Sequence, residues 1–441
     1  MANPVLRGEM WGLSFGPQFL EAALVNVCHA DGVLYPGCLT YMPGTFENAT
    51  LPDPEISIDP RWGYGSASYR NWYNVFLGKT SFSGSIGDMS LMNGIPLRFP
   101  IGPCATTPSD AGTLGTTLNG ATTAGALSIV TSADSYATND ILCIGEGTVV
   151  AESRSITRTA PNTYTVNYPL CYNHATGAAT PINKHGTVGV PNAYYSHVIT
   201  DGINLSPIQI SVVNTDSDLA VALMRRYIGA KIGRASYQAS EGSELRMSWE
   251  EILVRNLAFK DAASSASVPF YSTNIVAPTI VFPATDPYYF SQGSLTFAGT
   301  PWARVREFTL DVSNNLEPKY YINSVGVLNR IPYELREGKK EYGLRMNVDI
   351  IDSAFYLDLL RMGTYTTFKG FQVIMSFTRG VNDSITFTMP ANAPAVGGDS
   401  QGCFIRRAPH NIEEAPLISV PLDILTRNLQ ITVKDQIMVY P

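Results

Sequence analysis

Alternating apolar and polar side chains over residues 305–312 are the clearest structural pattern in the chain. Phe308, Leu310 and Val312 fall on one side of this segment, and polar residues separate them. Side chains on a strand switch faces at every residue, so the pattern predicts a β-strand with one apolar and one polar face. The residue types at 313–315 favour turns, so the strand is expected to end there.

Similar alternation predicts β-strands along most of the chain. Outside residues 104–188, the expected strands are 54–60, 208–212, 230–239, 243–253, 294–297, 341–350, 371–378, 384–388 and 417–439. Turn-forming residues between neighbouring segments predict three hairpins. They are 230–239 with 243–253, 294–297 with 305–312, and 371–378 with 384–388.

Three short segments have helix signals instead. Residues 17–27 could form one short helix, and residues 353–362 follow Asp352, a residue type suited to cap a helix. In residues 219–227 an apolar run follows acidic and Ser residues at 216–218 and ends in Arg, which also predicts a helix.

Residues 104–188 differ in composition from their surroundings. Ala, Thr and Gly dominate residues 105–125, which we interpret as a flexible linker, and residues 175–180 as a second one. Four short β segments are expected between them, at 126–131, 140–144, 148–159 and 163–168. This region is therefore predicted to be a small all-β module inserted into another unit.

The order of features near the N-terminus returns in the second half of the chain. Residues 56–59 and 308–311 are short alternating segments that end in Asp, and Gly-Lys pairs follow at 78–79 and 338–339. This weak internal repeat suggests two similar β units in tandem. The expected division is an N-terminal arm at 1–50, a first unit at 51–103 and 189–265, the inserted module at 104–188, and a second unit at 266–441. The arm could pack on a neighbouring subunit or on its own.

Composition and charge limit the possible functions. Charged residues are 15% of the 441 residues, hydrophobic residues are 45%, and the net charge is −7. The low charge fits either a surface largely covered by partners or a β-rich protein with many turns. The acidic balance argues against binding nucleic acid through phosphate neutralisation, but not against a surface that nucleic acid must pass without sticking.

No arrangement of residues in the sequence predicts catalysis, metal binding or a cofactor. The six cysteines are scattered without metal-ligand spacing; Cys28 and Cys38 could close a small loop, although separate buried thiols are the simpler interpretation. Cys104, in a Gly-Pro-Cys segment, is the nearest to a reactive group, and we interpret it as a structural thiol. The aromatic and Arg residues of 61–74 could stack on bases but are expected to be packing residues. The sequence predicts no signal peptide and no transmembrane helix.

Short segments in all parts of the chain share a family resemblance. They are 54–63, 78–79 and 83–85 in the first unit, 145–152 and 169–178 in the module, and 305–317 and 336–339 in the second unit. In this order they resemble the major tail tube proteins of long-tailed, siphovirus-type bacteriophages, over roughly residues 50–440. The resemblance implies a mainly β fold with minor helix. It would consist of tandem antiparallel β-barrel or sandwich units, each with a short helix, and the inserted all-β module.

The resemblance also implies a structural virion protein without enzymatic activity. Such proteins self-associate into stacked rings, and a tandem chain would need three copies for a pseudo-sixfold ring whose lumen conducts genomic DNA during ejection. Loops at 313–330 and 391–416 would bridge rings, and the module would lie outside. Expected partners are the tail terminator, baseplate and tape-measure proteins, with assembly in the host cytoplasm and no membrane. The lumen-lining residues are not identified, but a lumen poor in Lys and Arg is expected. The alternatives are a receptor- or glycan-binding tail protein and a tail terminator or adaptor.

Overall fold

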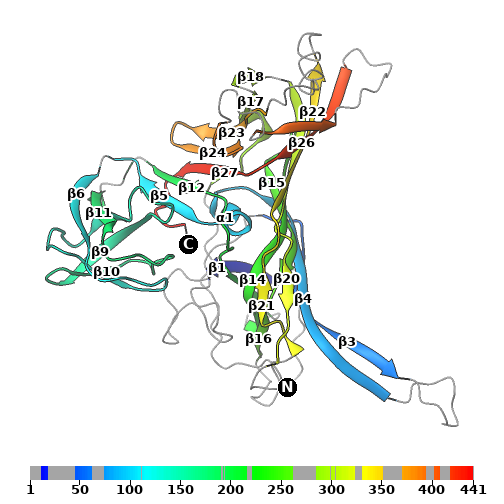
Figure 1. The fold of residues 1–441 in the computed structure, drawn as a ribbon, viewed down its shortest axis with the longest axis horizontal. Coiled ribbons are helices and arrows are strands. Elements are labelled where there is room, and N and C mark those ends of the chain that lie inside the picture. Colours follow the sequence, from blue (N-terminus) through cyan, green and yellow to red (C-terminus); the bar gives the residue numbers. More distant parts are fainter. Residues whose placement is uncertain are drawn as a thin grey trace.

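The protein has an elongated body with a compact module on one side and a projecting hairpin on the other (Figure 1). The computed structural model describes residues 11–17, 45–61, 74–110, 112–189, 192, 194–215, 221–261, 285–297, 299–302, 304–322, 330–350, 370–393, 402–407 and 418–440. These residues form mainly antiparallel β-sheets, which confirms the predicted mainly β fold. One α-helix lies among them, α1 (Ile95–Ile101).

The main sheet of the body has twelve strands. Along its main path lie β2 (Asn48–Thr50), β4 (Asn74–Ser90), β15 (Arg246–Leu253), β14 (Val221–Ser240), β19 (Val305–Ser313), β22 (Glu341–Ile350), β26 (Ile418–Thr426) and β25 (Phe404–Arg407). Beside this path lie β1 (Trp11–Pro17), β13 (Ile208–Thr215), β16 (Asn256–Asp261) and β3 (Pro54–Arg61). The main path therefore takes β4, β15 and β14 from the expected first unit and β19, β22 and β26 from the second.

Strand β14 connects different parts of this sheet because it is 20 residues long. Its first half pairs with β13 and β16, and its second half pairs with β15 and β19. In the second half, Tyr237 lies opposite Leu310 of β19. This pairing joins the two halves of the chain into one continuous sheet.

A seven-stranded sheet covers the apolar face of β19 and its neighbours. In order it contains β18 (Thr300–Trp302), β17 (Gly293–Phe297), β23 (Val373–Gly380), β24 (Asp383–Met389), β27 (Gln430–Asp435), β12 (Tyr195–Ile199) and β5 (Cys104–Pro108). The aromatic rings of Phe308 and Phe377 lie 5.8 Å apart between the sheets, and those of Tyr237 and Phe387 lie 5.6 Å apart. Alternation in the strands of both sheets therefore supplies one shared apolar core.

Three smaller pieces complete the described part of the body. Helix α1 is fully buried, with a Pro in its first turn, where the fixed proline φ suits a helix start. Its Phe99 packs edge-on against the buried Trp249 of β15. The 3₁₀ turn η1 (Phe290–Gln292) precedes β17, and β20 (Glu317–Lys319) pairs with β21 (Glu334–Arg336).

The inserted module is a separate six-stranded sheet with its own apolar core. Its order is β6 (Thr113–Leu118), β11 (Gly177–Thr187), β8 (Asp140–Ile144), β9 (Glu152–Ala160), β10 (Thr163–Val166) and β7 (Ser128–Val130). The presence of a small all-β module is thus confirmed. However, the prediction of a flexible linker at 105–125 was wrong, because β5 and β6 occupy about half of it. Strand β5 belongs to the body, where it pairs with β12.

Buried polar contacts hold the module against the body. The Thr106 N–H of β5 donates to the Ala151 carbonyl at 2.8 Å, and the Cys104 N–H donates to the Tyr172 hydroxyl at 2.7 Å. The buried Arg98 of α1 lies over the ring of Tyr172. The module is therefore packed onto the body and not tethered by linkers alone.

The structure supports some of the predicted elements and contradicts others. Strand 305–312 and the hairpins 230–253 and 371–388 are confirmed. The predicted helix at 219–227 was wrong: from Val221 onward these residues belong to β14, which has hydrogen-bonded neighbours on both sides. The predicted hairpin of 294–297 with 305–312 was also wrong, since β17 pairs with β18 and β23 instead. The helices expected at 17–27 and 353–362 lie outside the described residues.

Candidate assembly surface

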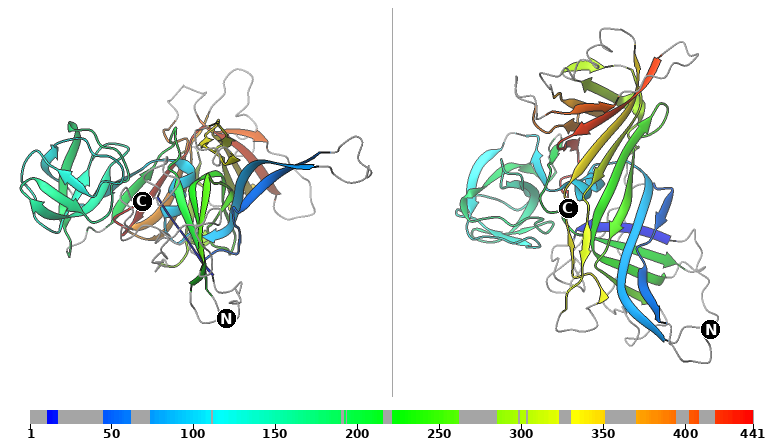
Figure 2. Two further views of the ribbon diagram at one scale, coloured as in Figure 1. Left: turned by 90° about the horizontal axis from the view of Figure 1, so that it is seen from below. Right: turned by 45° about the vertical axis from the view of Figure 1, so that its right-hand side comes forward.

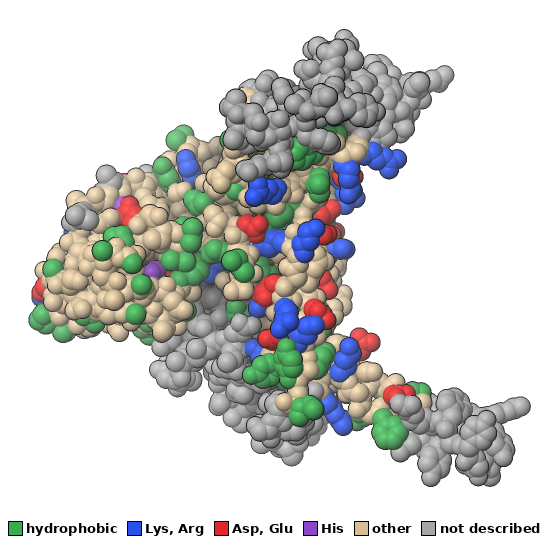
Figure 3. Space-filling model, viewed as in Figure 1, with side chains coloured by type: hydrophobic (Ala, Val, Ile, Leu, Met, Phe, Trp, Pro, Cys, Tyr) green, Lys and Arg blue, Asp and Glu red, His purple; other side chains and the backbone are tan. Residues whose placement is uncertain are grey.

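The large sheet exposes a polar face on the side away from its core. In β14, β15, β19, β22 and β26 the apolar side chains point to the core, and the intervening polar ones point outward. Lys/Arg and Asp/Glu side chains intermingle down this part of the body in Figure 3, on the side opposite the module. The charged residues that line this polar face are seven basic ones, Arg234, Lys339, Lys340, Arg345, Arg406, Arg407 and Arg427, and five acidic ones, Glu250, Glu307, Asp311, Glu341 and Asp423.

Two arginines on the polar face are closely paired with carboxylates. Arg345 donates to Asp311 at 2.5 Å, and Arg406 donates to Asp423 at 2.7 Å. The hydrogen bond to Asp311 and its negative charge raise the pKa of Arg345 above the ordinary arginine value. Exposed pairs of this kind contribute at most about 1 kcal/mol to folding. Their main consequence is a face on which opposite charges compensate locally.

A groove of about 730 Å³ crosses this polar face. Arg234, Glu250, Arg345 and Arg406 are among the residues that line it. Basic side chains outnumber acidic ones in its lining, six to three.

The hairpin formed by β3 and the first half of β4 carries uncovered apolar side chains. It projects from the body in Figures 1 and 2. Ile58 and Leu77 lie opposite each other, and they are 58% and 51% exposed. Ile56 and Phe76 are also about half exposed. These exposed apolar side chains make the hairpin a candidate contact surface.

Both ends of the sheet's main path are open among the described strands. Strand β2 pairs with β4 at one end, and β25 pairs with β26 at the other. Edge strands present unpaired backbone N–H and C=O groups that can add a further strand. The polar face, the hairpin and the two edges together form the candidate assembly surface.

Residues that could suggest catalysis are buried. Burial raises the pKa of the Cys104 thiol to about 12, so this thiol is protonated at neutral pH and is a poor nucleophile. His197 lies between Thr106 and Asp435 with contacts of 2.9 and 3.1 Å, which superficially resembles a catalytic triad. All three side chains are buried between paired strands, where a substrate could not reach them. They act as a cross-strand polar ladder.

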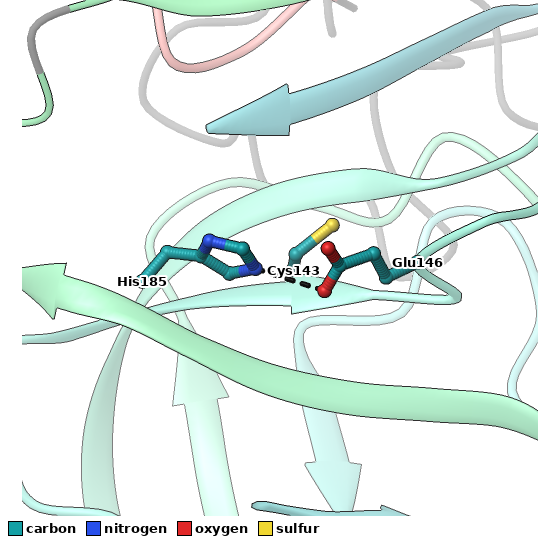
Figure 4. Close-up of side chains that lie close together, drawn as sticks. All are labelled: Cys143, Glu146 and His185. Atoms are coloured by element: carbon teal, nitrogen blue, oxygen red, sulfur yellow. Dashed lines mark hydrogen bonds and ion pairs between the residues drawn. The ribbon is translucent and has the colours of Figure 1, made fainter. Parts of the chain in front are cut away.

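A cluster in the module brings together three side chains that can bind metals. Cys143, Glu146 and His185 have their donor atoms within 4.8 Å of one another (Figure 4). The sequence analysis expected no metal site, because the cysteine and the histidine lie on different strands far apart in the chain. Glu146 lies in a Gly-Glu-Gly segment at 145–147, directly after β8. Only the pairing of β8 with β11 shows that the cysteine and the histidine lie close together.

Comparison with known protein families agrees with the assembly surface. A family model described as phage tail tube protein matches residues 96–424, which include the module and most of both halves of the main sheet path. The chain belongs to the phage tail tube protein family. The resemblance to phage tail tube proteins is thereby confirmed, without the siphovirus type, and the protein is a structural component of a phage tail. A search of curated proteins finds no match.

Membership of the tail tube family is consistent with the other features of the structure. A structural family suggests a protein without enzymatic activity, in agreement with the buried Cys104 and His197. The helices in the described part of the chain are all too short or too polar to cross a membrane. The four cysteines in that part, Cys104, Cys143, Cys171 and Cys403, are free thiols.

Proposed function

We propose that three copies of this tail tube protein close into a ring with pseudo-sixfold symmetry, and that stacked rings form a tube. The lumen of this tube would conduct genomic DNA during ejection. The observation that carries the proposal is the continuous sheet with two open edges, in a member of the tail tube family. In a closed ring each sheet edge pairs with the neighbouring copy, so the edges of a single copy would be open.

The strands along the main path of the twelve-stranded sheet support a ring of three copies. Strands β4, β15 and β14 come from the first proposed unit, 51–103 with 189–265, and β19, β22 and β26 come from the second, 266–441. Each half thus contributes three long strands to one path, with β14 and β19 paired where they meet. Six equivalent halves from three chains would repeat that arrangement around a ring.

The polar face is the surface we assign to the lumen. DNA carries one negative charge per about 1.7 Å of its axis, so a net basic wall would hold it. Arginines are present on this face, but Arg345 and Arg406 are each paired with a carboxylate. The expectation of a lumen poor in Lys and Arg does not fit this face, because seven Lys and Arg side chains and five carboxylates line it. We propose instead that pairing with carboxylates weakens the attraction of the arginines for DNA.

The remaining parts would serve contacts outside the lumen. The module lies on the side of the body away from the polar face, so it would decorate the outside of the tube. The β3–β4 hairpin would bury its apolar side chains against another copy. The ends and lumen of such a tube would meet the terminator, baseplate and tape-measure proteins, with assembly in the host cytoplasm.

Electron microscopy of the purified chain over a range of concentrations tests this proposal. End-on averages should show rings with an open centre and three protruding modules, and side views should show stacked rings. Compact particles without a central opening at every concentration would contradict the proposal and favour a receptor- or glycan-binding tail protein. Single rings that never stack would favour a tail terminator or adaptor.

A further inference from the structure

Three donor groups converge at one place in the module. Cys143 lies on β8 and Glu146 on the turn that follows it, while His185 lies on β11. Strands β8 and β11 are paired, with Cys143 directly opposite Asn183. The register shifts after Lys184, so alternation alone does not place His185; its 2.8 Å contact with the Glu146 carboxylate, which Asn183 also reaches, shows that it lies on this side of the sheet. The fold itself therefore presents the thiol and the imidazole together, and the turn adds the carboxylate (Figure 4).

The surroundings of His185 leave one position that a cation would fill. Its Nδ1 lies 2.7 Å from the Asp110 carbonyl oxygen, and its Nε2 lies 2.8 Å from a Glu146 carboxylate oxygen. A neutral imidazole has one N–H, whereas both of these neighbours are acceptors. If Nδ1 donates to Asp110, either a second proton or a metal ion must lie between Nε2 and Glu146. A backbone carbonyl on the far nitrogen is the usual partner of a metal-binding histidine.

The environment of the cluster is also built for a ligand of small size. Asn183 donates to the Glu146 carboxylate at 2.6 Å and fixes its orientation. Residue 112 is a glycine, and a Cβ there would stand 2.5 Å from His185 Nε2. Cys143 and His185 are buried, whereas the Glu146 side chain is 26% exposed. The carboxylate side is therefore the side of the cluster that is open to solvent.

We propose that Cys143, Glu146 and His185 bind one divalent metal ion of the zinc type, with water as a further ligand. Sulfur, imidazole nitrogen and carboxylate oxygen are the three donor types that zinc uses in proteins. Calcium and magnesium prefer oxygen donors throughout, so the thiol and the imidazole exclude them as the natural occupants. The ion would join β8, its following turn and β11, and so brace the module. This role does not depend on the tube proposal.

Metal binding to the full-length chain tests this inference. After treatment with a chelator and dialysis, the protein should take up one equivalent of Zn²⁺ per chain, measured by elemental analysis and by competition with a coloured chelator. Co²⁺ used in place of Zn²⁺ should produce a sulfur-to-cobalt charge-transfer band. Failure to take up Zn²⁺, or a cobalt spectrum without thiolate character, would overturn the proposal.

Variants assign the binding to this cluster. Cys143→Ser and His185→Gln should lose the bound equivalent, and Asn183→Ala should weaken binding by about 10–100-fold because it orients the carboxylate. Cys403→Ser, which removes another buried thiol far from the module, should bind like the wild type. Circular dichroism establishes that each variant is folded. Should Cys143→Ser not fold, Glu146→Gln provides the test from the exposed side of the cluster. Unchanged uptake in these variants would show that the ion binds elsewhere.

Discussion

Strands β3 and β19 have nearly the same sequence pattern but opposite surroundings. Residues 56–59 and 308–311 both alternate apolar and polar side chains and end in Asp. Leu310 is completely buried between two sheets, whereas Ile58 is 58% exposed on a projecting hairpin. Alternation thus determines which side chains share a face, but not what covers that face. The apolar face of β19 is covered by another part of the same chain, and we propose that another copy covers the apolar side chains of β3.

The charged residues show the same contrast between covered and uncovered positions. Glu152 in the module is buried. Its Oε2 accepts hydrogen bonds from the Cys171 N–H at 2.7 Å and from Arg154, and its Oε1 contacts His174. Asp311 on the polar face is partly exposed and pairs with Arg345. The first arrangement holds the fold together, and the second leaves a surface free for function. The predictions below test each side of this contrast.

Removing the buried carboxylate should have the largest effect on folding. Glu152→Gln leaves the buried Arg154 without a counter-charge, which should lower the free energy of unfolding by about 3–5 kcal/mol. Asp311→Asn, the matched change at an exposed pair, should lower it by at most about 1 kcal/mol. Chemical denaturation of both variants measures the difference. Equal losses would mean that burial does not distinguish the two pairs.

Truncating an apolar side chain should lower the free energy of unfolding much more in β19 than in β3. Leu310→Ala leaves a cavity between the sheets and should reduce the free energy of unfolding by about 2–5 kcal/mol. Ile58→Ala should change it by about 0.5 kcal/mol or less, because that side chain is exposed in the single chain. The denaturation midpoints of the unassembled proteins test this. A large loss at Ile58 would show that the chain covers its own hairpin.

Acid should remove the contribution of Glu152. Burial opposes its ionisation, but the charge of Arg154 and the hydrogen bond from His174 outweigh burial and lower the pKa of this carboxyl. A carboxyl whose pKa is lowered by folding stabilises the protein above its unfolded pKa of about 4.3, and that stabilisation is lost as the pH falls toward the folded value. The difference in stability between the wild type and Glu152→Gln should be constant near neutral pH and shrink below about pH 4.3. Denaturation curves at several pH values measure it, and a gap that widened in acid would contradict the assignment.

The sequence predicted those elements whose pattern and pairing are local. Strand 305–312 and the hairpins 230–253 and 371–388 need only alternation and a turn between them. The helix expected at 219–227 failed because its capping signals are local, whereas the β13 and β16 neighbours that make it a strand lie elsewhere in the chain. Strand β17 was assigned the wrong partner for the same reason, since β23 follows it at a long distance.

The candidate surfaces were less predictable than the fold. Family resemblance indicated a tube, but alternation in residues 305–312 did not say which face would be covered. The cluster of Cys143, Glu146 and His185 depends on the register of β8 and β11, which the sequence alone does not determine. A histidine two residues after an asparagine on a β-strand is a weak signal without the opposing cysteine.

A charge on the hairpin should impair assembly without affecting the fold. Ile58→Lys would place an ammonium group in the contact that we propose between copies. Ring formation should then require about a tenfold higher protein concentration, which corresponds to about 1.4 kcal/mol. Val149→Lys adds the same charge at an exposed module position and should assemble normally. Sedimentation velocity and electron microscopy at matched concentrations compare the two. Normal assembly of Ile58→Lys would remove the hairpin from the interface.

The smallest effect concerns the balance of charge on the polar face. Asp311→Asn with Asp423→Asn leaves Arg345 and Arg406 without their carboxylates, so the proposed lumen surface becomes locally basic. We expect the wild type to bind duplex DNA weakly at low salt, and the double variant to bind it more tightly. Each added phosphate contact would steepen the salt dependence of log K by about 0.9. A salt titration of fluorescence anisotropy measures that slope.

Asp134→Asn with Glu317→Gln removes two exposed carboxylates elsewhere and changes the net charge equally, so it serves as the control. If both double variants bound DNA alike, net charge would matter and the polar face would have no special role. If the first alone bound DNA, the carboxylates that neutralise Arg345 and Arg406 would be what lets DNA pass.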